Sequence, residues 1–226
     1  MTRAQVTPTT TVIAMPAGPG PGEQISPRRA ATRQRLLTAA AQMFAERGIH
    51  GATVEDICDA AGFTRGAFYS NFADKEELFF ALLRQKETEL LAQIDRVLQD
   101  DVADPGGDDV IERLVEKVLA VQPMDRTSHL VHAESVLHAI RDPQAARELT
   151  READRFQREL GRLLEVGLAR AGRRLSVAPA DVVAVLVAAF DAGMQQMLLR
   201  ESTDRPDPGL ARRTLPVILR ALSEPV

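Results

Sequence analysis

The segment from Thr53 to Lys75, TVEDICDAAGFTRGAFYSNFADK, holds residues whose types and spacing suit contact with nucleic acid. Thr53, Thr64 and Asp74 each stand where a helix is expected to begin, because Thr and Asp are favoured caps of helix N-termini. The first backbone N–H groups of a helix lack intrahelical partners and bind phosphate oxygens. Three helix starts in such a short segment therefore indicate a surface that contacts a phosphate backbone.

The side chains of this segment suggest how bases and phosphates are contacted. Arg65 is the long donor best able to reach a guanine edge, and Gly66 lets the backbone approach DNA closely. Ala67 suits contact with a thymine methyl group, whereas Tyr69 and Asn71 can reach phosphates or bases. The predicted DNA-binding residues, with the threonine hydroxyls and the lysine as phosphate partners, are Thr53, Thr64, Arg65, Gly66, Ala67, Tyr69, Asn71 and Lys75.

The same segment has the pattern of a helix-turn-helix. A helix from Thr53 to about Ala61 is followed by Gly62, which tolerates the left-handed turn, and Thr64 begins a short helix that ends near Asn71. Ile57 and Phe68 are the expected buried anchors. An earlier helix is predicted from Ser26–Pro27, an N-cap followed by proline at N1, to about Arg47, closed by Gly48. We therefore predict a three-helix DNA-binding domain at residues 26–78, with the helix-turn-helix at about 54–73.

The rest of the chain reads as helical. Asp74 with Glu77 resembles a capping box that begins a fourth helix toward Gln99, and DPGGDD (104–109) interrupts the pattern. The helix expected near 179–201 is apolar nearly all round, so it should be covered on more than one side. We predict an all-α fold whose body, residues 79–226, is a helical ligand-binding and dimerisation domain with helices near 108–121, 125–140, 143–172, 179–201 and 207–222.

Bulk composition sets the class of protein. The net charge is −4, but residues 28–75 carry seven Arg and Lys against five acids, which suits a mildly basic module on an acidic body. The single cysteine, Cys58, excludes an intrachain disulfide and is typical of a reducing compartment. The apolar run 182–190 is far shorter than the ~20 residues of a membrane span, and the N-terminus lacks the pattern of a secretory signal. We expect a cytoplasmic protein with no membrane association and a disordered tail at residues 1–25.

The body carries no motif that specifies a ligand. His129 and His132 share a helix face, but a metal site would need a third ligand, so we expect no metal and no cofactor. Apolar and methionine side chains here suit an adaptable small-molecule cavity, although each is equally compatible with ordinary core. The candidate pocket residues are Met124, His129, His132, Phe156, Phe190 and Met194.

The run GFTRGAFYSNFADKEELFFAL, preceded by AAAQMFAERGIHGATVEDICDAAG, resembles the DNA-binding domain of the TetR/AcrR family of transcriptional regulators over about residues 30–80. The resemblance implies an all-helical homodimer and repression that a small ligand relieves. It also implies DNA contacts at Thr53, Thr64, Arg65, Gly66, Tyr69 and Lys75. At position 71 this chain has Asn where many members have His or Tyr.

Dimerisation also follows from the residues themselves. The two last helices are strongly apolar, and one short recognition helix covers only a few base pairs, so specific binding requires two half-sites. We expect a homodimer through the last two helices that binds a palindromic double-stranded operator. The family resemblance, together with the covalent continuity of the recognition helix with the fourth helix, implies an unknown small-molecule effector that displaces the fourth helix.

Three alternatives remain at this stage. A helical enzyme that retains the motif is disfavoured, because the sequence shows no Ser/His/Asp constellation, phosphate-cradling glycine loop or paired metal-ligand motif. A helical small-molecule carrier is the second. An activator that binds DNA only with its ligand is the third, and the sequence does not distinguish it from a repressor.

Overall fold

The computed structural model describes residues 26–99, 110–200 and 209–226, and within these ranges the chain forms nine α-helices and one pair of short strands. The predicted tail at 1–25 and the breaks at 104–109 and 202–208 lie outside the described residues. The elements are α1 (Pro27–Gly51), α2 (Val54–Ala61), α3 (Arg65–Tyr69), α4 (Lys75–Gln99), α5 (Val110–Ala120), α6 (Arg126–Arg141), α7 (Pro143–Arg170), β1 (Arg173–Leu175), α8 (Pro179–Leu199), α9 (Gly209–Ala221) and β2 (Ser223–Pro225).

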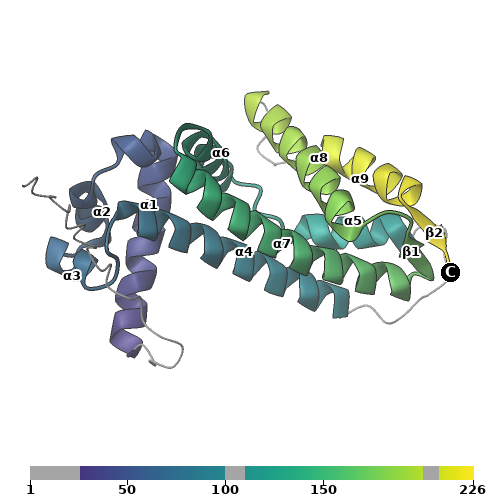
Figure 1. Ribbon diagram of the computed structural model, residues 1–226, viewed down its shortest axis with the longest axis horizontal. Helices are drawn as coiled ribbons and strands as arrows, with labels where there is room; N and C mark the ends of the chain where they lie inside the picture. Colours follow the sequence, from purple (N-terminus) through teal and green to yellow (C-terminus); the bar gives the residue numbers. More distant parts are fainter. Residues whose placement is uncertain (1–25, 100–109, 201–208) are drawn as a thin grey trace, which may run out of the picture.

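The helices form an elongated molecule with a head, α1 to α3, at one end (Figure 1). Helix α4 leads from the head along the length of the molecule beside α7, and α5, α9 and the C-terminus lie at the opposite end. The all-α prediction is confirmed. The antiparallel pair of β1 and β2, which closes the last turn of α9 onto the end of α7, was not anticipated.

Capping residues begin the helices of the head where the sequence indicates. The Ser26 hydroxyl accepts a hydrogen bond from the Arg29 N–H at 3.3 Å, and Thr53 and Asp56 form a complete capping box. Asp74 accepts from the Glu77 N–H, and Glu77 in turn accepts from the Ala73 N–H at 2.6 Å. These local bonds satisfy N–H groups that a helix leaves without partners, so short helices begin at fixed residues.

Two glycines with positive φ shape the head. Gly62 ends α2 at φ 68°, ψ 39°, the left-handed turn that the sequence predicts. Gly48 has φ 70° and ψ 168°, but α1 does not end there as expected: a further turn follows and reaches Gly51. The first helix is therefore kinked, and its last turn is a separate piece of structure.

Three hydrophobic clusters hold the elements together. The first joins α1, α2 and α3 to the first two turns of α4, and it takes in Val131 of α6 and Ala145 of α7. It therefore crosses the predicted domain boundary at residue 78. Within it the rings of Phe44 and Phe79 meet edge to face with centroids 5.1 Å apart. The second cluster joins α5, α8 and α9, and the third joins the end of α4 to α5 and α7.

Helix α8 is less covered than its composition suggests. Val182, Val183 and Met194 are buried, and the helix packs on α7 and α9. Val185 and Leu199 are exposed, Leu199 to 75%. Within the single chain, α8 is therefore covered on more than one side, by α7 and by α9, as the sequence predicts, and it keeps some exposed apolar side chains. By length and composition α8 alone among the described helices is able to cross a membrane, a test that core helices of soluble proteins also pass.

Replacing Gly62 with alanine is expected to lower the free energy of unfolding by about 1–2 kcal/mol, because an L-residue at positive φ is strained. Urea denaturation monitored by circular dichroism measures the change. Gly66→Ala, in the first turn of α3 without a positive φ, is the control and is expected to be neutral or slightly stabilising. Equal midpoints for the two variants would contradict the left-handed assignment at Gly62.

Candidate nucleic-acid interface

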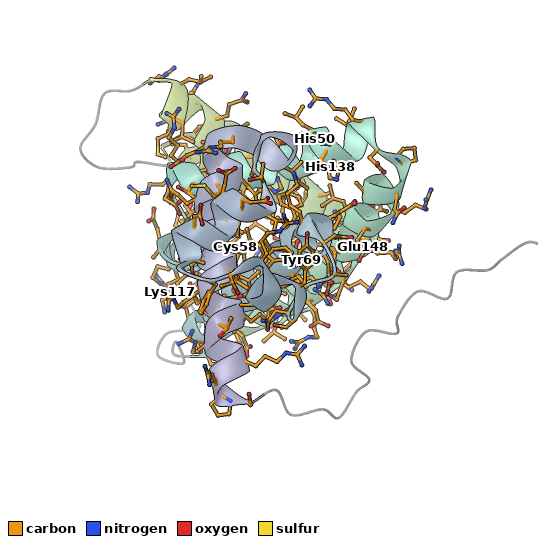
Figure 2. All side chains as sticks on the ribbon, turned by 90° about the vertical axis from the view of Figure 1, so that its left-hand side faces the viewer. His50, Cys58, Tyr69, Lys117, His138 and Glu148 are labelled. Atoms are coloured by element: carbon orange, nitrogen blue, oxygen red, sulfur yellow. The ribbon has the colours of Figure 1, made fainter. Side chains whose placement is uncertain are left out.

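Helix α3 presents its N-terminus to solvent at the far end of the head. Thr64, Arg65 and Gly66 are exposed, and Tyr69 is 49% exposed despite its size. The view onto the head places Tyr69 on the near side of the molecule (Figure 2). The start of α3 therefore offers free backbone N–H groups on an open surface.

Burial of two phenylalanines fixes this short helix. Phe68, the predicted anchor, is fully buried, and its ring lies 5.9 Å from that of Phe72, centroid to centroid. Phe72 packs under the Arg33 guanidinium of α1 at 4.1 Å, and Phe63 lies beneath that of Arg35 at 4.6 Å. Phe63 and Phe72 therefore hold the short helices against α1 at these contacts.

The two threonine hydroxyls act as caps in the free chain. Thr53 Oγ1 donates to Asp56 Oδ2 at 2.7 Å and accepts from the Asp56 N–H, and Thr64 Oγ1 accepts from the Ala67 N–H at 3.3 Å. In each case the hydroxyl oxygen accepts one backbone N–H and is held at the start of its helix. The hydrogen bond with Thr53 and the nearby Arg47 hold the pKa of the Asp56 carboxyl below its usual value.

Arg65 already has an acidic partner within the head. Its Nη1 lies 2.6 Å from Glu55 Oε1 of α2, with both side chains more than half exposed. Its guanidinium also lies 5.8 Å from the centre of the Tyr69 ring. Tyr69 and then Glu55 raise the pKa of Arg65, which stays charged. Contact with a base requires this exposed ion pair to open, at a small cost for a pair in water.

Lys75 and Asn71 are engaged internally. The Lys75 ammonium donates to the Ala52 carbonyl at 2.6 Å, and partial burial lowers its pKa. The Asn71 amide nitrogen donates to the Ala67 carbonyl at 2.8 Å, and its Oδ1 is buried without a hydrogen-bond partner. Lys75 therefore ties the start of α4 to the junction before α2. The predicted phosphate contacts of both residues remain predictions.

Three arginines of α1 have roles that the sequence analysis missed. Arg29 donates to the Ser70 carbonyl and Arg33 to the Asn71 carbonyl, both at 3.0 Å, while Arg35 donates to the Ala61 carbonyl at 2.7 Å. These carbonyls lie at the C-terminal ends of α3 and α2, where cations are favourable. The sequence alone indicates only that these arginines add local positive charge, because the carbonyl groups that accept their hydrogen bonds lie 26 to 41 residues further along the chain.

The candidate pocket residues of the body lie in different surroundings. Met124 and Phe190 pack against the second hydrophobic cluster, and Met194 is buried. His132 is half exposed and lies 3.2 Å from Asp191 of α8, which raises the pKa of His132. His129 and Phe156 are partly buried. An open hollow of about 410 Å³ between α1, α4 and α7 is lined by other residues.

A charged network between α4 and α7 was also missed. Arg84 lies within 3.5 Å of Glu148 and Glu152, and Arg155 lies 2.7 Å from Glu152. Glu152 is only 7% exposed. The burial of Glu87 itself is the main cause that raises the pKa of Glu87, and repulsion from Glu152 is the second. No group of three His, Cys, Asp or Glu side chains in the described ranges is placed to hold a metal ion.

Comparison with known proteins finds similarity in the head. Residues 36–82 match the model described as bacterial regulatory proteins, tetR family. The repressor AcnR of Corynebacterium diphtheriae is 36% identical over 107 residues, which cover 44% of this chain and 56% of that protein. The repressor KstR2 of Mycobacterium tuberculosis is 47% identical over 73 residues, 32% of this chain and 36% of that protein. The chain spans about half the length of the first curated relatives it matches.

Solved structures show the same fold over most of the chain. A TetR-family regulator from Mesorhizobium loti aligns with a TM-score of 0.66 at 20% identity, covering 86% of this chain and 96% of that one. A regulator from Saccharomonospora viridis, solved in complex with choline, aligns with a TM-score of 0.63 at 19% identity, covering 86% and 99%. At these identities the likeness concerns the fold.

Asp56→Asn is expected to lower stability at neutral pH and to make stability less sensitive to acid. Because the folded-state pKa of Asp56 lies below its ordinary 3.8, its contribution is complete above that value and is lost as pH falls through the folded pKa. Urea midpoints between pH 7 and pH 3 measure this. Asp59→Asn, on the same helix but outside the capping box, is the control. Parallel pH profiles for wild type and Asp56→Asn would contradict the role of the box.

Proposed function

We propose that this chain, whose N-terminal domain belongs to the TetR family, is a sequence-specific DNA-binding transcriptional regulator. In this proposal the protein acts as a repressor in the cytoplasm, and a small-molecule ligand releases it from DNA. The named relatives, which are repressors, support this mode. We assign DNA binding to residues 26–78 and effector binding and dimerisation to residues 79–226.

The observation that carries the proposal is the outward N-terminus of α3. Its exposed start is anchored from below by the buried Phe68, and the capped start of α2 at Thr53 belongs to the same small head. Backbone N–H groups at helix starts bind phosphates, and exposed side chains on the first turns of such a helix read base edges.

Selection of duplexes from a random-sequence library tests whether the chain binds DNA with sequence preference. A palindromic consensus is expected, and absence of duplex binding even at low salt would end the proposal.

Arg65→Ala is expected to weaken binding to the selected duplex by about 1–3 kcal/mol and to relax sequence preference, because Arg65 is the predicted base-reading donor. Fluorescence anisotropy with the selected and scrambled duplexes measures both effects. Arg162→Ala, an exposed arginine paired with Glu159 on α7, is the matched control and should leave affinity unchanged. A uniform loss on both duplexes would instead assign Arg65 to phosphate contact.

The exposed apolar face of α8 and α9 supports a homodimer. Val185 on α8 and Val217 on α9 are exposed in the single chain, Val217 to 62%. The two helices pack on one another, and each carries an apolar side chain that the single chain leaves exposed. An exposed apolar surface of this kind marks a contact with another protein, and a two-fold pair of such helix pairs makes a four-helix interface. Two heads in fixed relation then reach two half-sites.

Val217→Arg is expected to shift the protein from dimer to monomer, because a buried unpaired charge is costly at an apolar interface. Light scattering after size-exclusion chromatography should report a mass falling from twice the 24.7 kDa of the chain to that value. Val226→Arg, at the exposed C-terminus, is the control. An unchanged dimer in Val217→Arg would place the interface elsewhere.

The effector is proposed to bind among the helices of the body, near Met124, His129, His132, Phe156, Phe190 and Met194. The similar regulator solved with choline shows that a protein of this fold takes a small molecule, which supports an effector here without identifying it. A carrier, an enzyme or a ligand-dependent activator remains the alternative. Affinity for any effector, measured with and without duplex, separates them. Duplex lowers the effector affinity of a repressor, raises that of an activator, and leaves that of a carrier or enzyme unchanged.

A further inference from the structure

We infer that Glu134 of α6 is a positioning residue that fixes the junction between α1 and α2 and so orients the DNA-binding head. The inference rests on the proposed function, because orientation of the head matters only if the head binds DNA.

The kink in α1 creates the need for an acceptor. Gly48 leaves helical geometry at φ 70°, ψ 168°, and a new turn begins at Ile49. Gly48 thus stands where an N-cap residue belongs, and glycine has no side chain to accept the N–H groups of that turn.

Glu134 supplies the missing acceptor from another helix. Its Oε1 accepts a hydrogen bond from the Ile49 N–H at 2.9 Å, across 85 residues of chain. A Cβ on Gly48 would lie 2.9 to 3.3 Å from the Glu134 carboxyl atoms, so the absent side chain at Gly48 makes room for the carboxylate. A negative charge at a helix start is also favourable. Position 48 therefore requires glycine for its conformation and for this contact.

The turn that Glu134 caps leads directly to the DNA-binding elements. Ile49 is buried in the first hydrophobic cluster, and three residues later the Ala52 carbonyl accepts from the Lys75 ammonium. Thr53, the next residue, begins α2. The junction is thus held from α6 on one side and from the start of α4 on the other.

Further contacts keep α6 in register with the head. His138, one turn beyond Glu134, is 5% exposed and lies 3.4 Å from Glu76 at the start of α4. Its ring meets that of His50 edge to face at 5.2 Å, and the two side chains lie together in the view onto the head (Figure 2). Val131, three residues before Glu134, is buried in the first cluster. Val131, Glu134 and His138 are three and four residues apart in sequence, so they lie on one face of α6.

The adjacent face of α6 contacts the body. His132 lies 3.2 Å from Asp191 of α8. Helix α6 therefore touches α8 on one side and the α1–α2 junction on another, so a displacement of α6 within the body acts directly on the hydrogen bond of Glu134.

The test compares Glu134→Ala, Glu134→Gln and Glu159→Ala. Amide hydrogen exchange at residues 49–53 in the free protein is expected to speed up about tenfold or more in Glu134→Ala, because a hydrogen bond to a charged acceptor is lost. Glu134→Gln keeps an amide oxygen as acceptor and should change exchange by no more than about fivefold. Glu159→Ala removes an exposed carboxylate on α7 and should match wild type. If Glu134→Ala does not fold, Glu134→Asp replaces it, and faster exchange is again expected.

Binding to the selected duplex completes the test. Glu134→Ala should bind about three- to tenfold more weakly, since the junction must then be ordered on binding, and Glu134→Gln should restore most of the affinity. Unchanged exchange in Glu134→Ala, or unchanged affinity despite faster exchange, overturns the inference. Absence of duplex binding by the wild type refutes the proposed function separately, while the exchange data still decide whether Glu134 holds the junction.

Discussion

The burial of Phe68 is the interaction on which the candidate interface depends. A helix of five residues has no stability of its own in water, because nucleation costs more than so few hydrogen bonds return. Helix α3 persists because Phe68 and Phe72 are buried in a core shared by α1, α2 and the first turns of α4. That core leaves the first turn of α3 exposed, so the surface proposed to meet DNA and the anchor that stabilises it lie on opposite faces of one short helix.

The local features of the head were predictable from sequence. Thr53, Thr64 and Gly62 act through hydrogen bonds or backbone conformations that involve only a few neighbouring residues. A short segment of sequence is therefore enough to predict their effects. The contact of Glu134 with Ile49 and the ion pairs of Glu152 were not predictable in this way. The Ile49 contact and the pairing of Glu152 with Arg84 depend on the register between helices, across 85 and 68 residues of chain, which periodicity alone does not set. The extra turn after Gly48 was missed for the same reason, since its cap comes from α6.

Helix α8 combines a strongly apolar composition with incomplete cover. The single chain covers it on the sides that face α7 and α9, as the sequence predicts, and leaves Val185 and Leu199 exposed. A sequence pattern reports which surfaces avoid water without saying whether the same chain or a second copy covers them. The exposed Val185, Leu199 and Val217 are available for the dimer contact proposed above.

The electrostatics of the head follow from how its arginines are used. Arg29, Arg33 and Arg35 hold the C-terminal ends of α2 and α3 through carbonyl oxygens, which leaves their positive charges in place while fixing their positions. These charges therefore contribute to the field around the head without needing to move onto phosphates. In the proposed complex, direct phosphate contact falls to the N–H groups at the starts of α2 and α3, whose positions the same arginines secure. The net charge of −4 is therefore compatible with the proposed DNA binding, because a few fixed cations and two oriented helix starts act within the short range that salt permits.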